Sequence, residues 1–449
     1  MENVFHSLRA KLFDGTKIFI HPDVEELYSR SLEVYAAGPG LIVEDVLPFV
    51  EKKYKHEDFM ETGNEKHNAA AALAYSLRWD PAYIVKLYYP LLNIVESGYF
   101  NFDDNIHLRI LDVGSGTGSV MWGVISFFET LRDAMRDHGA SLNVNIDFLC
   151  VDRNGARNDL MNCNVKEIEE RYSGRYTVTV INRNVLASNK VTDVLGRHFH
   201  LVTLCHFINE IGSENHKCLY RALNAYGELT VPVDGFMVLI EPADETGKVN
   251  MYSARHALTG ESGFTITDPC PVDGFKGGRI DCVNCWGVNY PGNVYPEIMH
   301  DLPGLTLPPD QRKNDVKFLY TVLKKTGPRA ITEKPLAYSQ CTSEGRVKVT
   351  SLHCGEKKQD ACTSVQKLGM KPFNSMFLPG DYVDMAVRHD VEQGGSEHNV
   401  KLPRSSMINM GKYVTEPVAT LSAPLSAEDE QAARKFMELL LSGEIYADA

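Results

Sequence analysis

The spacing of hydrophobic residues changes several times along the chain, and each change predicts a different kind of structure. Up to residue 100, apolar side chains recur at the spacing of amphipathic helices. Beyond it, short apolar runs alternate with amphipathic stretches, which is typical of an open, largely parallel sheet covered by helices. The pattern divides the chain into a helical N-terminal region (1–100), an α/β domain (101–258 plus 311–330), a Cys-rich insertion (259–310), a small basic β module (331–425) and a C-terminal helix (426–449).

Capping residues place the helices of the N-terminal region. Asp23 is expected to cap a helix that ends at Gly38, and a second helix is expected over 64–77. Asp80-Pro81 combines an N-cap residue with proline at the first helical position, so it predicts the start of a third helix, which Pro90 would kink.

In the α/β domain, β-branched runs and amphipathic stretches place the elements one by one. Strands are expected over 106–113, 144–151, 176–181, 200–205, 236–241 and 316–323. Helices are expected over 119–138, 156–172, 215–229 and 248–258. Such a sheet binds ligands at the carboxyl ends of its strands.

A glycine-rich loop, Gly114-Ser-Gly-Thr-Gly118, joins the first of these strands to a helix. Glycines permit a tight turn and let a ligand approach the backbone closely. Their spacing is G-x-G-x-G, whereas dinucleotide sites use G-x-G-x-x-G, so the loop favours S-adenosylmethionine over NAD. Gly114, Gly116 and Gly118 are therefore candidate cofactor-binding residues.

Polar residues at the ends of the neighbouring strands complete this expected site. Asp112 ends the first strand, where its carboxylate would meet the ammonium of a methionine moiety directly or through water. Asp152 ends the second strand, where a carboxylate accepts both ribose hydroxyls. Asn184 follows the third strand and is placed to read the edge of adenine. These three residues join the glycines as candidate ligands of S-adenosylmethionine.

Two titratable residues after the fourth strand are weak catalytic candidates. Methyl transfer is an in-line displacement, so positioning contributes most of the catalysis and a base contributes less. His206 and Glu210 are placed to deprotonate an acceptor, but both suit a structural role equally well. Cys205 lacks the preceding proline of the nucleophilic cysteine in some RNA methyltransferases, and it is expected to be a small buried side chain.

Three of the ten cysteines, Cys270, Cys282 and Cys285, follow each other as C-x11-C-x2-C. Cys354 ends a predicted strand just before a glycine and is the leading candidate for a fourth ligand. Alternatives to it are Cys341, Cys362 and His353. The spacing predicts a metal site, and zinc and an iron–sulfur cluster both accept four thiolates.

The net charge of −13 argues at first against a nucleic-acid partner. Residues 312–371, however, hold thirteen Lys and Arg against five Asp and Glu, a balance of +8. This basic stretch suits either RNA contact at one face or an ordinary solvated surface. No run approaches the 18 apolar residues of a membrane span, and the N-terminus shows neither a secretory signal nor a clear presequence.

Several short motifs occur in a particular order along the chain. They are Ala82-Tyr83, Leu111-Asp-Val-Gly-Ser-Gly-Thr-Gly118, His206-Phe-Ile-Asn-Glu-Ile211, Ile240-Glu-Pro242, Ala254-Arg255, Pro269-Cys270-Pro271, Phe318-Leu-Tyr320 and Cys354-Gly355. In this order they resemble the methyltransferase-like small-ribosomal-subunit assembly factors of mitochondria and their bacterial relatives. The resemblance covers roughly residues 64–390, and its Glu-Pro, Pro-Cys-Pro and late cysteine are more specific than the glycine loop.

The resemblance implies a class I S-adenosylmethionine methyltransferase fold and a [4Fe–4S] cluster on Cys270, Cys282, Cys285 and Cys354. It also implies action on the assembling small ribosomal subunit near its rRNA, in the mitochondrial matrix of a eukaryote or the cytoplasm of a bacterium. It leaves methyl transfer open. The rival functions are a working RNA methyltransferase and a small-molecule methyltransferase whose cysteine loop is braced by zinc. The oligomeric state is not indicated.

Overall fold

The structure is a computed structural model, which describes the longer segments of the first three quarters of the chain. The described residues are 2–14, 17–50, 62–96, 105–182, 198–211, 235–261, 263–268, 315–325, positions 223, 226, 227, 229 and 230, and the backbone of short strands within 287–383. Among the described helices, none is long and apolar enough to cross a membrane.

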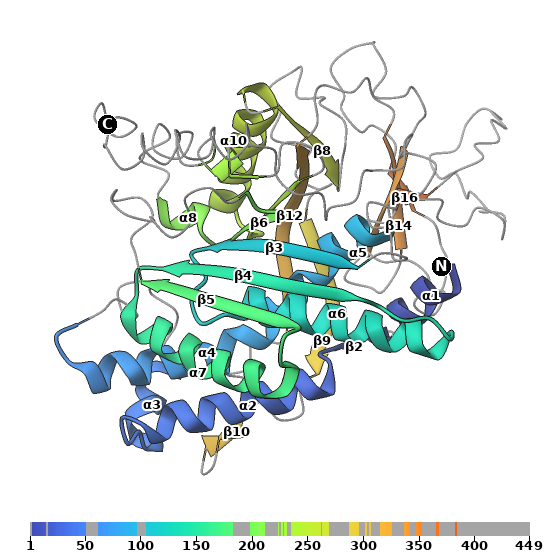
Figure 1. Cartoon of the computed structure of the whole chain (residues 1–449). Coiled ribbons are helices and arrows are strands. Elements are labelled where there is room, and N and C mark those ends of the chain that lie inside the picture. Colours follow the sequence, from blue (N-terminus) through green and yellow to red (C-terminus); the bar gives the residue numbers. More distant parts are fainter. Residues whose placement is uncertain are drawn as a thin grey trace, which may run out of the picture.

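A large mixed sheet forms the centre of the fold (Figure 1). Its five parallel strands lie in the order β5 (Tyr176–Asn182), β4 (Val144–Asp152), β3 (Ile106–Val113), β6 (Leu201–Cys205) and β7 (Phe236–Pro242). β12 (Asp315–Lys325) lies antiparallel beside β7, and both β8 (Phe264–Asp268) and β9 (Gly287–Tyr295) pair with β12. This strand order, with an antiparallel strand beside the fifth parallel one, is that of class I S-adenosylmethionine methyltransferases. The predicted fold class is confirmed.

The register of the parallel strands brings the predicted site residues to one edge. Asp112 of β3 pairs with Cys150 of β4 on one side and with Thr203 of β6 on the other. Asp152, the last residue of β4, pairs with Asn182 at the end of β5. The inner strands β6 and β7 are nearly continuous apolar runs because helices cover the sheet on both faces, whereas β5 at the edge alternates between buried and exposed residues in its first half.

Helices lie on both faces of the sheet, as expected. α6 (Ser119–Asp137) and α7 (Gly155–Tyr172) lie on one face, and α8 (Ile208–Ile211) and α10 (Glu245–Glu261) lie on the other (Figure 1). β3 is thus followed by a turn and α6, and β4 is followed by a turn and α7. The helix expected over 215–229 falls mostly outside the described residues.

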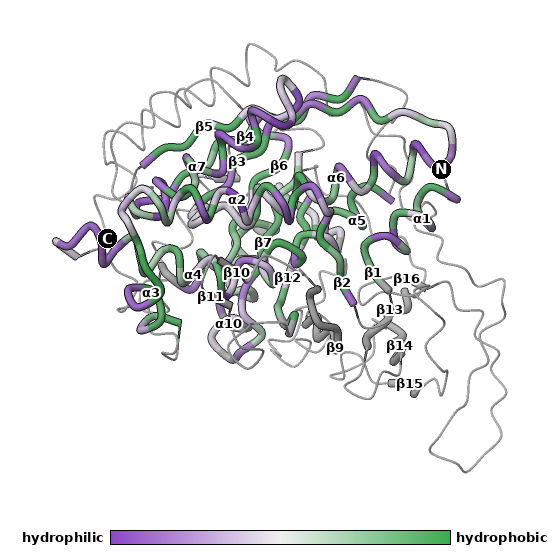
Figure 2. Tube along the Cα trace, turned by 90° about the horizontal axis from the view of Figure 1, so that it is seen from below, coloured by the Kyte–Doolittle hydropathy of each residue, from purple (hydrophilic) through white to green (hydrophobic). Residues whose placement is uncertain are grey.

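The N-terminal region packs onto the face that carries α6 and α7. Its elements are α1 (Glu2–Leu12), β1 (Phe13–Asp14), β2 (Lys17–Phe19), α2 (Pro22–Ala37), α3 (Val43–Val50), α4 (Glu65–Lys86) and α5 (Tyr88–Glu96). Hydrophobic residues of these elements and of the sheet belong to one core, and the tube of Figure 2 shows green, hydrophobic stretches alternating with purple, hydrophilic ones along the helices and strands. This shared burial is the main stabilisation of the arrangement.

Two local expectations for this region were wrong. The N-cap of α2 is His21, whose Nδ1 accepts the Asp23 N–H at 3.3 Å, so Asp23 is the second residue of the helix instead of its cap. Residues 13–14 and 17–19 are not helical, because they form β1 and β2, which pair antiparallel at the sheet edge, where β2 runs parallel to β9. Phe13 and Ile18 are fully buried there, and this burial outweighs helix propensity.

The predicted helix start at Asp80-Pro81 was also wrong. The helix expected from residue 64 is α4, whose N-cap Asn64 accepts the His67 N–H at 3.1 Å, but α4 then continues through Pro81 to Lys86. The break falls at Leu87, before α5. The carboxylate of Asp80 is buried and accepts hydrogen bonds from other elements, so it caps nothing. Burial of nearly the whole helix offsets the backbone hydrogen bond that Pro81 removes.

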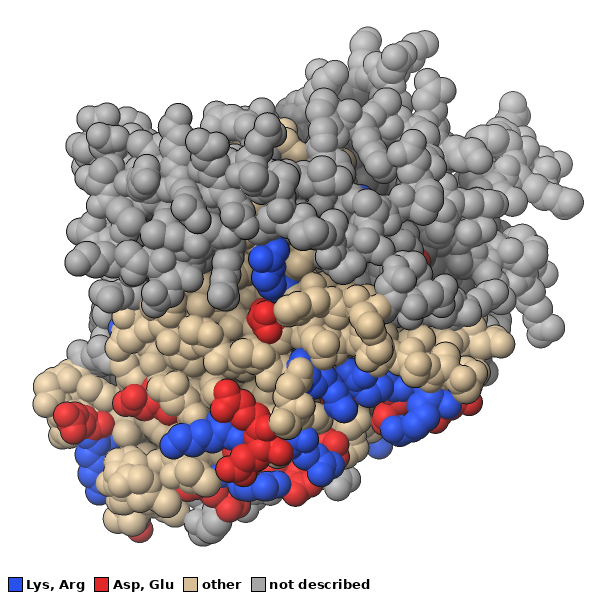
Figure 3. Space-filling model, in the orientation of Figure 1, with Lys and Arg blue, Asp and Glu red and all other residues tan. Residues whose placement is uncertain are grey.

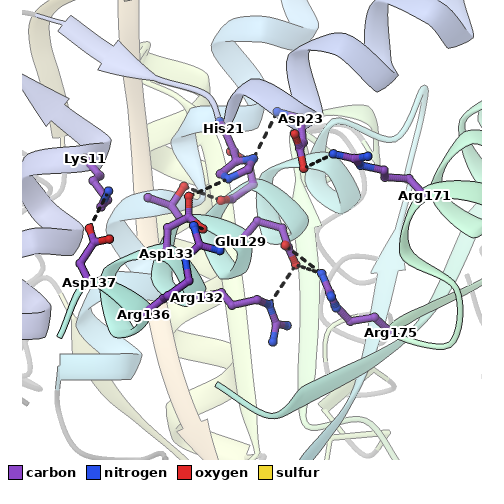
Figure 4. Close-up of polar contacts among 12 residues, drawn as sticks. Lys11, His21, Asp23, Glu129, Arg132, Asp133, Arg136, Asp137, Arg171 and Arg175 are labelled. Carbon is purple, nitrogen blue, oxygen red and sulfur yellow. Dashed lines mark hydrogen bonds and ion pairs between the residues drawn. The ribbon is translucent and has the colours of Figure 1, made fainter. Parts of the chain in front are cut away.

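Charged side chains join the N-terminal helices to α6 and α7 at the surface (Figure 4). His21 Nε2 lies 3.3 Å from Asp133 of α6, and Arg171 of α7 donates to Asp23 at 3.0 Å. Half-exposed pairs of this kind contribute little each, about 0–1 kcal/mol. They set the register of helices that the apolar core already holds together.

Beyond β12, only short strands belong to the described residues. β13 (Leu336–Cys341), β14 (Val347–Leu352), β15 (Val365–Lys367) and β16 (Tyr382–Val383) form a separate sheet in the order β15-β14-β13-β16. These four strands lie within the segment expected to form the basic β module. A hairpin of β10 (Asp301–Leu302) and β11 (Leu305–Thr306) lies in the Cys-rich insertion. The C-terminal helix expected over 426–449 lies outside the described residues.

Candidate cofactor site

The glycine loop has the backbone geometry that only glycine adopts readily. Gly114, Gly116 and Gly118 have φ of +70°, +56° and +97°. A Cβ on Gly114 would lie 2.5 Å from the Phe207 ring, and one on Gly118 would lie 2.7 Å from the sulfur of Met161. A Cβ on Gly116 would meet no atom within 4 Å, so this residue alone of the three faces open space. A ligand can therefore approach the backbone at Gly116.

Asp152 is tied to the same loop. Its Oδ2 accepts the Gly116 N–H at 2.9 Å, and its Oδ1 accepts the Asn154 N–H at 2.8 Å. Both carboxylate oxygens keep a further lone pair for a ligand hydroxyl. Asn154 in turn caps α7 through the Arg157 N–H. The carboxylate at the end of β4 is thus held beside the loop, where it was expected.

The carboxyl of Asp112 is strongly perturbed by its surroundings. It is fully buried, its Oδ1 accepts the Thr203 hydroxyl at 2.8 Å, and its Oδ2 has no hydrogen-bond partner in the described structure. Burial raises the pKa of its carboxyl to about 7, while the Thr203 hydrogen bond opposes this shift and the nearby Asp152 adds to it. A buried carboxylate with one unsatisfied oxygen suits a cationic ligand.

A pocket opens over the glycine loop. It is lined by Tyr75, Tyr83, Gly114, Ser115, Gly116, Thr117, Ser119, Val120, Arg157, Cys205, His206 and Phe207. One wall is the loop and the start of α6, and the opposite wall is α4 with its two tyrosines. The guanidinium of Arg157 lies 4.8 Å from the centre of the Tyr75 ring, which joins α7 to α4 at this wall.

His206, a weak catalytic candidate, lines this pocket in an unusual conformation. Its φ of +56° is rare outside glycine, and its ring stacks on Tyr83 with centroids 4.5 Å apart. The buried Lys86 places Nζ 2.8 Å from His206 Nε2 and 3.9 Å from the centre of the Tyr83 ring. Burial and the Lys86 charge hold the pKa of His206 well below its usual value. Because an ammonium only donates, Nε2 accepts and Nδ1 carries the proton of the ring.

The remaining candidates are divided between described and undescribed residues. Cys205 is half-buried and lines the pocket, and burial raises the pKa of its thiol, which suits an inert side chain. Glu210 lies on α8, but its side chain is outside the described residues, as is Asn184. Cys270, Cys282, Cys285 and Cys354 also lie outside them. No group of three or more His, Cys, Asp or Glu suited to a metal was found within the described part of the chain.

Two lysines of the basic stretch are not available to a partner. Lys324 of β12 is 2% exposed, because β12 is an inner strand with both faces covered. Lys325 donates to the carbonyl of Gly227 at 2.6 Å and lies over the Phe264 ring. On the face seen in Figure 3, basic and acidic side chains of the described residues are interspersed. A basic surface would therefore have to be built from the rest of residues 312–371.

Among the residues that sequence reasoning missed are Tyr75, Tyr83 and Arg157, which line the pocket, and Lys86, which contacts Tyr83 and His206. Tyr75, Tyr83 and Lys86 lie on α4, and their i, i+8 and i+11 spacing puts them on one side of a helix. The break expected at Asp80-Pro81 hid that periodicity. For Arg157, its place in the first turn of the helix after Asp152 was the available signal.

The family model described as the mitochondrial small ribosomal subunit Rsm22 matches residues 70–276. The match includes α4, the glycine loop and Pro269-Cys270-Pro271, and it confirms over that range the resemblance predicted from the motifs. No curated protein matches the sequence.

Solved structures of methyltransferases are similar to the chain at low identity. Loganic acid methyltransferase with SAH is 11% identical, with a TM-score of 0.32, and the match covers 56% of this chain and 96% of that one. Geranyl diphosphate methyltransferase with GPP and sinefungin is 11% identical, with a TM-score of 0.26 and coverage of 68% and 98%. A SAM-dependent methyltransferase of Methanosarcina mazei is 14% identical, with a TM-score of 0.25 and coverage of 51% and 96%.

Proposed function

Because residues 70–276 match the Rsm22 family of the mitochondrial small ribosomal subunit, we propose that this protein is a small-ribosomal-subunit assembly factor. It binds S-adenosylmethionine on a methyltransferase fold, carries an iron–sulfur cluster in its cysteine-rich part, and contacts rRNA. The family match carries the proposal, and the description of that family supports the mitochondrial matrix as the place of action.

The described residues fit the cofactor. S-adenosylmethionine supplies an activated methyl group when bound. Asp152 offers its free lone pairs to the ribose, and Gly116 leaves open space beside it. Asp112 offers its unsatisfied oxygen to the ammonium of the methionine part. Because Phe207 packs on Gly114, that ammonium reaches Asp112 through a bridging water or after a small shift of the ring.

The titration of Asp112 gives this assignment a pH signature. We expect S-adenosylmethionine to bind more weakly as the pH falls from 8 to 6, approaching tenfold per pH unit below the pKa, because a proton and the ammonium compete for one carboxylate. Titration calorimetry at several pH values measures this. Asp112→Asn should remove the dependence, and 5′-methylthioadenosine, which lacks the ammonium, should show none in the unchanged protein. Equal pH dependence for both ligands would refute the role of Asp112.

The same shift predicts the sign of a stability effect. The pKa of Asp112 is raised on folding, so its contribution is present below the unfolded value near 3.8 and is lost as the pH rises to about 7. Asp112→Asn should therefore raise the melting temperature at pH 8 while weakening S-adenosylmethionine binding. A site that sacrifices stability in this way serves a ligand.

We place the cluster on Cys270, Cys282, Cys285 and Cys354, with a single zinc ion as the alternative occupant. Their spacing supports a four-thiolate site, and the resemblance supports iron and sulfur. The site would join the insertion to the β module, because three ligands lie in one segment and the fourth lies about seventy residues later.

We place the rRNA contact in the basic stretch, outside Lys324 and Lys325 of β12. Reversing the charge of Arg346, Lys357 and Lys358 should weaken co-sedimentation with small ribosomal subunits about tenfold or more and flatten its salt dependence. A matched reversal of the exposed Arg30, Lys66 and Arg136 on the N-terminal helices and α6 should change neither. Equal effects of the two triple variants would remove the basic stretch from the rRNA contact.

The proposal also separates binding from turnover. The Lys86 ammonium donates a hydrogen bond to Nε2 of His206. This nitrogen therefore has no free lone pair with which to deprotonate a methyl acceptor. We therefore expect the purified protein to bind small subunits without transferring a methyl group. Stoichiometric transfer to small-subunit rRNA in a single-turnover assay would favour the RNA methyltransferase instead, and failure to sediment with subunits at low salt would refute the assembly function.

A further inference from the structure

Asp80 lies in the middle of α4 and points beneath the glycine loop. It is fully buried, and one oxygen, Oδ2, accepts two hydroxyls: Tyr28 of α2 at 2.9 Å and Thr117 of the loop at 2.6 Å. Thr117 is also held through its backbone, because its carbonyl accepts the side-chain amide of Asn164 of α7 at 2.9 Å. Asn164 in turn accepts the hydroxyl of Ser31 at 2.5 Å. Two residues of α2 are thus connected to the loop, Tyr28 through Asp80 and Ser31 through Asn164.

Burying a carboxylate costs free energy of folding, so a buried Asp80 is expected to make contacts that serve the structure or the site. Burial raises the pKa of Asp80 to about 6, while hydrogen bonds from Thr117, Tyr28 and Ser76 and the charge of Arg157 oppose the rise. Thr117 and Arg157 both line the cofactor pocket. The carboxylate is therefore hydrogen-bonded to one residue of the pocket and attracted by the charge of another.

We propose that Asp80 is a positioning residue that sets the glycine loop for its ligand by holding the Thr117 hydroxyl. Thr117 lies between Gly116, whose N–H donates to Asp152, and Gly118, which is the N-cap of α6. Fixing Thr117 therefore fixes the peptide on either side of it. This inference rests on the proposed binding of S-adenosylmethionine, and it makes the N-terminal helices α2 and α4 part of the cofactor site.

The test compares full-length variants that alter one hydrogen bond at a time. Thr117→Val removes the hydroxyl while keeping the shape, and it should weaken binding of S-adenosylhomocysteine about tenfold by calorimetry. Thr117→Ser restores the hydroxyl and should restore affinity to within about threefold. Asp80→Asn should weaken binding, and adding Thr117→Val to it should have little further effect, because both changes disturb the same bond.

Two controls separate positioning from stability. Tyr28→Phe removes the other hydroxyl from Oδ2, and it should lower the melting temperature with less effect on affinity than Thr117→Val has. Tyr176→Phe removes a buried hydroxyl from Glu129, a carboxylate that does not line the pocket, and it should lower the melting temperature with affinity unchanged. Affinities are measured well below each melting temperature.

Amide hydrogen exchange of residues 114–118 without ligand provides a second readout. It should rise in Thr117→Val and Asp80→Asn but remain unchanged in Tyr176→Phe. If the unchanged protein binds no S-adenosylhomocysteine, the cofactor assignment fails, and the exchange measurement still decides the role of Asp80. Loop exchange in Thr117→Val and Asp80→Asn equal to that of the unchanged protein would overturn the proposal, as would affinities within twofold of it.

Discussion

Cys270→Ser and Cys354→Ser should each produce a protein that has lost its cluster. The unchanged protein, purified without oxygen, should be brown, absorb broadly in the visible range and contain about four iron atoms per chain. One missing thiolate leaves an open coordination position, so we expect either variant to be colourless with little iron. Cys163→Ser, on α7 and half-buried, and Cys218→Ser, in the helix expected over 215–229, should keep colour and iron.

The same experiment tests how the cluster couples to folding. Site formation and local folding share free energy, so loss of the cluster should increase hydrogen exchange in the insertion and the β module together. Exchange in β3, β4 and α6 should not change, because these elements belong to the apolar core that the N-terminal helices share. If the protein purified without oxygen is colourless and contains one zinc ion, the four-thiolate site stands but its occupant is zinc instead of a cluster. Absence of any metal from the unchanged protein would refute the site itself.

Gly116→Val should abolish binding of S-adenosylmethionine and S-adenosylhomocysteine. A side chain at this position points into open space beside Asp152, which is the space that the ligand requires. We expect more than a hundredfold loss of affinity, roughly 2.7 kcal/mol. The φ of +56° adds a conformational cost of about 1–2 kcal/mol to folding, so the melting temperature should fall as well.

Gly139→Val is the matched control for that variant. Gly139 follows α6, has a φ of +72°, and a Cβ built on it would also meet nothing within 4 Å. It therefore carries the same backbone cost without lying at the pocket. The two variants should lose similar stability, and only Gly116→Val should lose the ligand. Loss of affinity in both would attribute the effect to folding, and retention in Gly116→Val would remove the glycine loop from the cofactor site.

The α/β part of the fold was readable from the sequence because its signals are local. The expected strand over 106–113 coincides with β3, and those over 144–151 and 176–181 differ from β4 and β5 by one residue. Apolar alternation, a glycine turn and an amphipathic helix follow each other within about thirty residues. Parallel pairing then brings Asp112 and Asp152 to one edge without further information.

Asp80 shows where local reading fails. A carboxylate before proline is a strong helix-start signal, yet the chain continues as α4 because the surrounding side chains are buried against α2, α6 and α7. Lys324 shows that local reading also fails for charge. A lysine in a basic stretch is expected at the surface, but β12 lies between β7 and β9, and Lys324 is buried there. In both cases the deciding contacts come from residues far away in sequence.

By itself, the sequence determined the order of strands and helices, the position of the glycine loop and the two aspartates beside it, because backbone propensity and hydrophobic period act over a few residues. Only the tertiary structure decided that Lys86 meets His206, that Asp80 holds Thr117 and that Phe207 packs on Gly114. These contacts join residues 37 to 120 positions apart. Their geometry depends on how the N-terminal helices settle on the sheet, which is a property of the packed core as a whole.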